Sequence, residues 1–99
     1  MLHTVNKSPF DHAAFATCLR FARQGSAVLL IEDGVYAALR ETTVSPQVQE
    51  ALKSVAIYAL KPDLEARGMR DRVMEGIRLV DYAGFVDLAT EHDAVQAWL

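Results

Sequence analysis

The sequence has little of what several functional classes require: one cysteine, one tryptophan, and no long uninterrupted apolar run. A membrane-spanning helix needs about 18 or more apolar residues, whereas the longest clear run here is Ala27–Ile31. The N-terminus has no basic segment ahead of a long apolar stretch, so it does not resemble a secretory signal. A single thiol, Cys18, cannot form an internal disulfide. We therefore expect a cytoplasmic chain with no membrane partner and a reduced thiol.

Positive charge is also sparse, which bears on nucleic-acid binding. The formal net charge is -3, and residues 81–99 contain acidic residues but no lysine or arginine. The arginines between residues 67 and 78 are interleaved with acidic residues, so they form no basic stripe. We expect no direct contact with DNA or RNA.

Glycine and histidine are too few or too scattered to build a cofactor or metal site. A dinucleotide-binding turn or a P-loop needs glycines in the first strand-to-helix connection, but no glycine precedes Gly25. His3, His12 and His92 lie far apart, and none is paired with a second ligand at helical spacing. We expect neither a cofactor nor a metal, and His3 is predicted to be a strand histidine satisfied by a local partner.

Hydrophobic residues make up 52% of the 99 residues, which excludes disorder, and their pattern predicts strands that alternate with helices. The predicted strands cover residues 2–5, 27–31, 55–60 and 77–81, and the predicted helices cover about 11–23, 35–40, 45–54, a brief segment ending at 68, and 82–91. Residues 95–99 fit either a fifth strand or a helical turn. Alternating elements predict one domain, residues 1–99, of α/β class: a small doubly wound parallel sheet of four or five strands with helices on both faces.

The predicted strands all end in polar segments, beginning at Asn6, Glu32, Lys61 and Asp81. In doubly wound sheets, ligands gather beyond the carboxyl ends of the strands. Glu32 and Asp33 also precede a predicted helix, where negative charge is favourable whether or not a ligand binds.

Cys18 is the one side chain with strong nucleophilic potential toward sulfur. On the first predicted helix it shares an apolar stripe with Phe15, Leu19 and Ala22, and Arg20 lies opposite. An apolar setting raises the pKa of a thiol and makes it inert. The residues alone favour a packed structural cysteine over a reactive one, and both interpretations remain open.

The apolar surplus is larger than a small interior can hold, which favours surfaces covered by partner chains. Trp98 and Leu99 at the C-terminus fit this expectation. Trp98 could equally fold back onto its own sheet.

Four segments of the sequence resemble the DsrH/TusB family over nearly the whole chain. They are the opening MLHTVNKSPF, LLIEDGVYAA at residues 29–38, LKPDLEARG at residues 60–68, and VDYAGFVDL followed by VQAWL in the last twenty residues. The resemblance implies a small α/β subunit that assembles with DsrE-like and DsrF-like subunits, or with TusD and TusC, into a heterohexamer with two copies of each. That complex relays persulfide sulfur, and its main persulfide cysteine belongs to the DsrE/TusD-like subunit.

The family has two branches with different acceptors. In the DsrH branch, sulfur moves between a TusA-like carrier and DsrC during sulfur oxidation. In the TusB branch, it moves toward 2-thiouridine at the wobble position of tRNA. Cys18 resembles the first-helix cysteine of DsrH proteins, which typical TusB chains lack, so we expect a DsrH-like subunit. In that setting Cys18 would be a secondary sulfur acceptor or a residue that contacts DsrC, and the alternatives are a TusB-like subunit or a non-catalytic scaffold.

Overall fold

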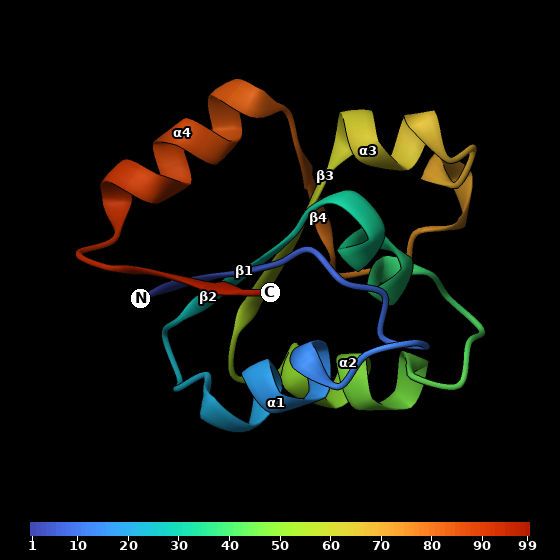
Figure 1. Ribbon diagram of the computed structural model, residues 1–99, viewed down its shortest axis with the longest axis horizontal. Coiled ribbons are helices and arrows are strands. Elements are labelled where there is room, and N and C mark those ends of the chain that lie inside the picture. Colours follow the sequence, from blue (N-terminus) through green and yellow to red (C-terminus); the bar gives the residue numbers. More distant parts are fainter.

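A computed structural model, which describes residues 1–99, contains one sheet of five parallel strands (Figure 1). The strand order is β4-β3-β2-β1-β5. The strands are β1 (Leu2–Val5), β2 (Ala27–Leu30), β3 (Ala56–Leu60), β4 (Arg78–Val80) and β5 (Val95–Trp98). The predicted parallel sheet is confirmed, and the segment that the sequence pattern left undecided is a fifth strand at one edge.

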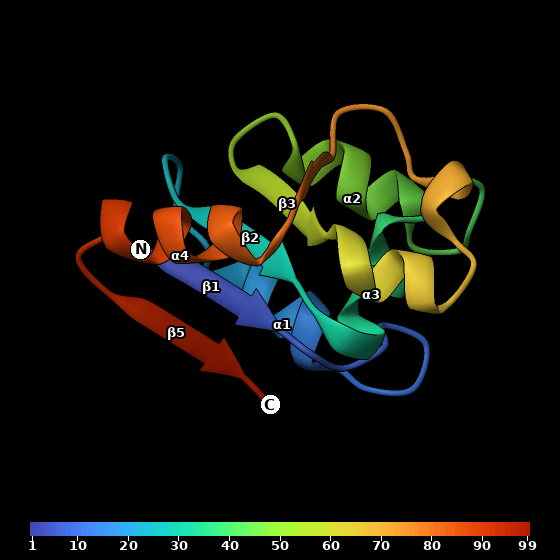
Figure 2. The ribbon, with the colours of Figure 1, turned by 90° about the horizontal axis from the view of Figure 1, so that it is seen from above.

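The helices lie on both faces of this sheet, as predicted. They are α1 (Ala14–Phe21), the 3-10 helix η1 (Glu32–Ala38), α2 (Ser45–Ala51), α3 (Lys61–Ala66), the 3-10 turn η2 (Arg70–Arg72) and α4 (Tyr82–Glu91). Figures 1 and 2 show α1 and α2 on one face and α4 across the opposite face. The chain adds β2, β3 and β4 successively toward one edge of the sheet, and α4 then leads it back to the other edge, where β5 pairs with β1. The sheet is therefore doubly wound.

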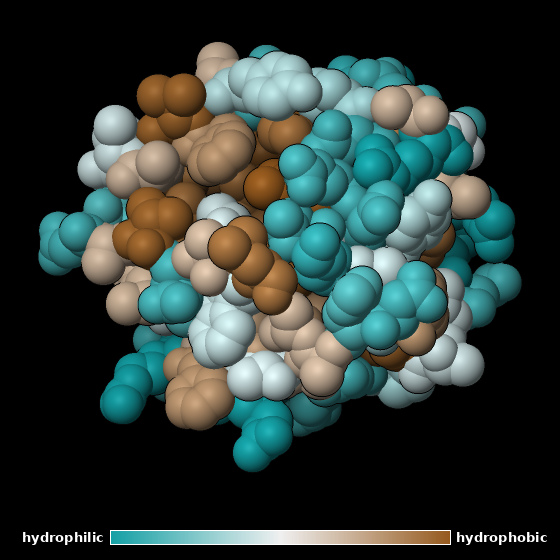
Figure 3. Space-filling model, viewed as in Figure 1, coloured by the Kyte–Doolittle hydropathy of each residue, from teal (hydrophilic) through white to brown (hydrophobic).

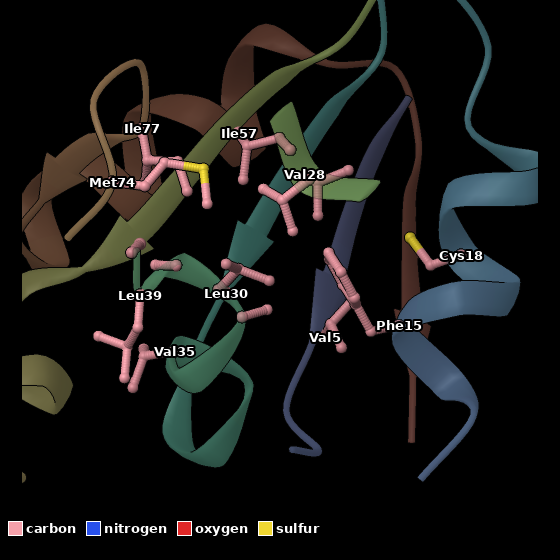
Figure 4. Close-up of a cluster of buried hydrophobic side chains, with 14 of the residues drawn as sticks. Val5, Phe15, Cys18, Val28, Leu30, Val35, Leu39, Ile57, Met74 and Ile77 are labelled. Carbon is pink, nitrogen blue, oxygen red and sulfur yellow. The ribbon is translucent and has the colours of Figure 1, made fainter. Parts of the chain in front are cut away.

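The two faces bury separate apolar clusters, and the alternation of side chains along β2 supplies both. Val28 and Leu30 belong to the larger cluster under α1 and α2, part of which Figure 4 shows. Ala27 and Leu29 belong to the smaller cluster under α4, which contributes Leu88. All of β2 is buried, which explains its apolar sequence without polar interruptions.

The first helix begins later than its sequence pattern predicts. The sequence pattern predicts a start at about residue 11, but α1 starts at Ala14 and has no side-chain cap. The backbone oxygen of Ser8 accepts hydrogen bonds from the amides of Asp11 and His12, and Ser8 Oγ accepts one from the amide of Phe10. These turn interactions satisfy the amides that a longer helix would have used.

Candidate functional site

The polar segments at the carboxyl ends of β2 and β3 pair with one another. Arg67 donates to Asp33 Oδ1 from Nη2 at 2.9 Å and from Nε at 3.1 Å, and this charge-assisted pair raises the pKa of Arg67 above its usual value. Asp63 Oδ2 accepts a hydrogen bond from the amide of Glu32 at 2.6 Å. Glu32 has a left-handed backbone conformation, with φ 50°, which is unfavourable for residues other than glycine. The hydrogen bond from its amide to Asp63 stabilises this turn.

The same edge of the sheet contains one unusually close backbone approach. Gly34, in η1, lies against the end of β1, and a Cβ atom at Gly34 would overlap the carbonyl oxygen of Val5 and lie 2.9 Å from its carbonyl carbon. The absence of a side chain therefore lets η1 sit directly over the end of β1. This contact fixes where the polar residues of η1 meet α3.

At the carboxyl end of β4, the polar side chain has a structural contact. Asp81 caps α4 by accepting from the amide of Gly84 at 2.8 Å. No group of three or more histidine, cysteine, aspartate or glutamate side chains is arranged to hold a metal ion. Of the polar segments predicted at this edge, only those after β2 and β3 contact one another, through the Glu32–Asp63 and Asp33–Arg67 pairs. Asp81 caps its own helix, and Asn6 Oδ1, after β1, is buried with no hydrogen-bond partner.

Cys18 lies inside the larger apolar cluster. Its side chain has no exposed surface, and Figure 4 shows it directed from α1 toward the strands, near Phe15. Burial removes the thiolate from water and raises the pKa of Cys18 from 9.0 to about 12. The predicted buried stripe of this helix is confirmed. The folded chain offers a sulfur donor no open approach to this thiol.

The other feature of note is an aromatic group at the β5 edge. Trp98 Nε1 donates a hydrogen bond to His3 Nδ1 at 3.1 Å, and the Trp98 ring stacks on Phe21 with centroids 6.0 Å apart. Beside these rings is a pocket of about 350 Å³, lined by Met1, His3, Phe21, Arg23, Ser26, Gln96 and Trp98. Of the two placements that the sequence leaves open for Trp98, the structure shows packing on its own sheet. His3 has Trp98 as its hydrogen-bond partner.

No local sequence pattern links His3 to Trp98, because the two residues are 95 positions apart. Their contact depends on β5 pairing with β1 in a register that sets Val5 opposite Trp98. Because the sequence pattern of residues 95–99 fits either a strand or a helical turn, it does not predict this pair.

The burial of His3 makes the stability of the fold depend on pH. The pKa of His3 is lowered, first by burial and then by the positive charge of the N-terminus, and protonating Nδ1 would remove the acceptor. The unfolded chain therefore takes up a proton more readily than the folded one. The free energy of unfolding should be highest above the ordinary histidine pKa of 6.5 and should decrease as the pH falls below it.

His3→Asn tests this prediction, since the asparagine amide oxygen can replace Nδ1 as the acceptor without titrating. Urea unfolding of both proteins between pH 5 and 8, in about half-unit steps, should show a smaller loss of stability at acid pH in the variant. His12→Asn, at an exposed position, is the matched control and should leave the wild-type profile unchanged. Parallel profiles for wild type and His3→Asn would contradict the assignment.

Apolar surface is also exposed on α4. Tyr82 and Val86 are each 61% exposed one helical turn apart, and Figure 3 shows hydrophobic groups gathered over this part of the molecule. None of the helices is long and apolar enough to traverse a bilayer.

The fold and the site together define a class of protein: a small doubly wound α/β protein with ion pairs at one edge of the sheet, a buried thiol and exposed apolar surface. Comparisons with known proteins identify the family within this class. Residues 7–95 match the family described as DsrH like protein. The chain is 41% identical to Protein TusB of Pectobacterium parmentieri and 38% identical to Protein TusB of Escherichia coli K12, in each case over 98 residues covering 99% of this chain and all of the relative. The chain therefore belongs to the DsrH/TusB family.

Solved structures agree on the fold. The ychN protein of E. coli superposes with a TM-score of 0.82 at 18% identity, covering 97% of both chains. The protein MTH1491 of Methanobacterium thermoautotrophicum has a TM-score of 0.75 at 22% identity, covering 97% of this chain and 95% of its own. At these identities the similarity establishes architecture only.

Proposed function

We propose that this protein is a TusB-type subunit of a cytoplasmic sulfur relay that supplies sulfur for 2-thiouridine at the tRNA wobble position. It acts as one domain, together with TusC-like and TusD-like subunits in a heterohexamer. The sulfur is carried as a persulfide on a partner's cysteine. The observation that carries the proposal is that the chain's one thiol is buried with a raised pKa, in a family whose named relatives of the same length are TusB proteins.

This proposal replaces the branch that Cys18 led us to expect. The DsrH-like assignment depended on one cysteine, whereas the TusB relatives match along the whole chain at about 40% identity. Cys18 itself keeps a DsrH-type role as a second candidate, as an acceptor for sulfur passing between TusA-like and DsrC-like carriers or as a contact residue for DsrC. That role requires the apolar cluster around α1 to open in the complex, because the folded chain encloses the thiol.

Deleting the gene in its own organism tests the proposal. We expect 2-thiouridine at the wobble position to fall to background, measured by mass spectrometry of digested tRNA, because the relay loses a required subunit. Wild-type protein and Cys18→Ala should both restore the modification. Unchanged thiolation after deletion would contradict the proposed function, and failure of Cys18→Ala alone, with the complex intact, would favour the acceptor role.

Alanine is the better replacement for Cys18 in this experiment. Serine would place a hydroxyl in an apolar cluster with no partner, at a cost of about 1–3 kcal/mol. A loss of function in Cys18→Ser could therefore come from unfolding. Thermal unfolding of Cys18→Ala should accompany the assay, so that stability and sulfur transfer are judged separately.

A further inference from the structure

The two edges of the sheet differ in how well they are protected against pairing with another chain. At one edge, β4 has only three residues, and one of them is Arg78, whose guanidinium lies 5.9 Å from the centre of the Tyr58 ring. Short length and charge are the usual means of blocking an edge. At the other edge, β5 has four residues, none charged, and Val95, Gln96 and Ala97 are exposed. Figure 2 shows β5 at the margin of the sheet beside β1.

The backbone of β5 has hydrogen-bonding groups available at this margin. The carbonyl of Ala94 accepts from the amide of Leu2, and bonded residues alternate along a parallel strand. The amides and carbonyls of Val95 and Ala97 therefore point away from β1. The one contact to these groups is a weak one, from Gln96 Nε2 to the carbonyl of Ala97 at 3.5 Å.

Apolar surface flanks these free groups. On the α1 face, the pocket beside Trp98 is bordered by Phe21, which is 63% exposed, and by Met1. On the α4 face, Val95 is 51% exposed. An added strand would thus find backbone partners at the margin and apolar contacts on both faces, which is how β-strand addition obtains affinity and specificity.

The charge of the pocket indicates what kind of strand fits. Its lining contains Arg23 and the N-terminal residue Met1 but no acidic residue. Arg23 is exposed and makes no ion pair within the chain. This local positive charge stands out in a chain whose net charge is -3. A segment with a carboxylate near an apolar side chain would complement it.

We propose that the β5 edge is a docking site for an extended strand of another subunit of the relay. That strand pairs with the backbone of Val95 and Ala97, places an apolar side chain in the Trp98 pocket, and sets a carboxylate against Arg23. The inference deepens the proposed function, on which it rests, by assigning the surface through which this subunit joins the complex.

Hydrogen exchange of the co-expressed complex tests the backbone part. The amides of Val95 and Ala97 should exchange about tenfold or more slowly in the complex with the TusC-like and TusD-like subunits than in the isolated chain. Ala97→Pro removes one outward amide without removing a bond to β1, and should reduce assembly. Ala97→Gly keeps that amide and is the matched control.

Charge reversal tests the pocket part and does not depend on the proline variant folding. Arg23→Glu should weaken assembly about tenfold or more, measured by titrating the subunit into its partners. Arg20→Glu makes the same change at an exposed position outside the pocket and should assemble like wild type.

The outcomes separate the inference from the function on which it rests. A complex that forms with unprotected Val95 and Ala97 amides, and that tolerates Arg23→Glu, overturns the docking site and leaves the proposed function standing. A chain that pairs with itself through β5, seen as a dimer by native mass spectrometry and lost in Ala97→Pro, assigns the edge to a second copy and overturns the partner. Failure to form any complex overturns both.

Discussion

Replacing Gly34 by alanine should destabilise the fold by about 3 kcal/mol or more, a large part of the roughly 5–15 kcal/mol that holds a small domain together. The added methyl group would overlap the backbone carbonyl of Val5, and a strand in the middle of the sheet cannot move aside as a flexible side chain would. Relief requires η1 to shift away from β1. That shift would also disturb the contact of Asp33 with Arg67.

Urea unfolding followed by circular dichroism measures this effect, and Gly68→Ala supplies the control. Gly68 has a φ of 66°, and a Cβ there would meet nothing within 4 Å, so its substitution costs only the left-handed backbone penalty of about 1–2 kcal/mol. Gly34→Ala should be clearly the more damaging change. Equal losses in the two variants would show that the approach of η1 to β1 is not a tight contact.

Much of the fold follows from short-range patterns in the sequence. Uninterrupted apolar runs identify β2 because both of its faces are covered, and α4 has the predicted bounds, residues 82–91. Segments whose structure depends on distant contacts are harder to predict. The four residues of β5 are strand only because α4 returns them to the side of β1.

The candidate site was partly predictable for the same reason. The burial of Cys18 follows from its neighbours on one helix, and the structure confirms it. The pairing of Asp33 with Arg67 and of His3 with Trp98 joins residues far apart in the chain, and no local pattern encodes such contacts. Polar residues at strand ends predict that such groups share one edge of the sheet, but not which of them pair with one another.

The placement of the polar side chains, the thiol and the β5 edge supports the proposed role of this chain as a subunit that acts with partners. Two of its strand-end carboxylates, Asp33 and Asp63, are engaged in contacts within the chain, and its thiol is enclosed. What the fold leaves available is an unprotected strand edge with apolar and positively charged surroundings. This arrangement supports the proposed function, in which this chain contributes binding surface and a partner's cysteine carries the sulfur.

The burial of Cys18 predicts that its thiol is nearly unreactive in the isolated chain. The thiolate is the attacking species, and a shift of the pKa from 9.0 to about 12 lowers its population near pH 8 about a thousandfold. Burial in the cluster under α1 slows attack further, because an aromatic disulfide reagent cannot reach the sulfur without local opening. Labelling followed by absorbance should therefore be slower by about a thousandfold or more than for an exposed thiol.

The exposed thiol for comparison is Gln24→Cys in a Cys18→Ala background, since Gln24 lies on the surface just beyond α1. Wild type in urea should label as fast as this control, which proves that the thiol is intact and only protected. Adding the partner subunits then separates the two roles of Cys18. If the complex labels as slowly as the isolated chain, the cysteine serves packing, because a sulfur acceptor must be reachable at some stage of transfer. Labelling of the isolated folded chain at the control rate would contradict the burial on which the proposed function depends.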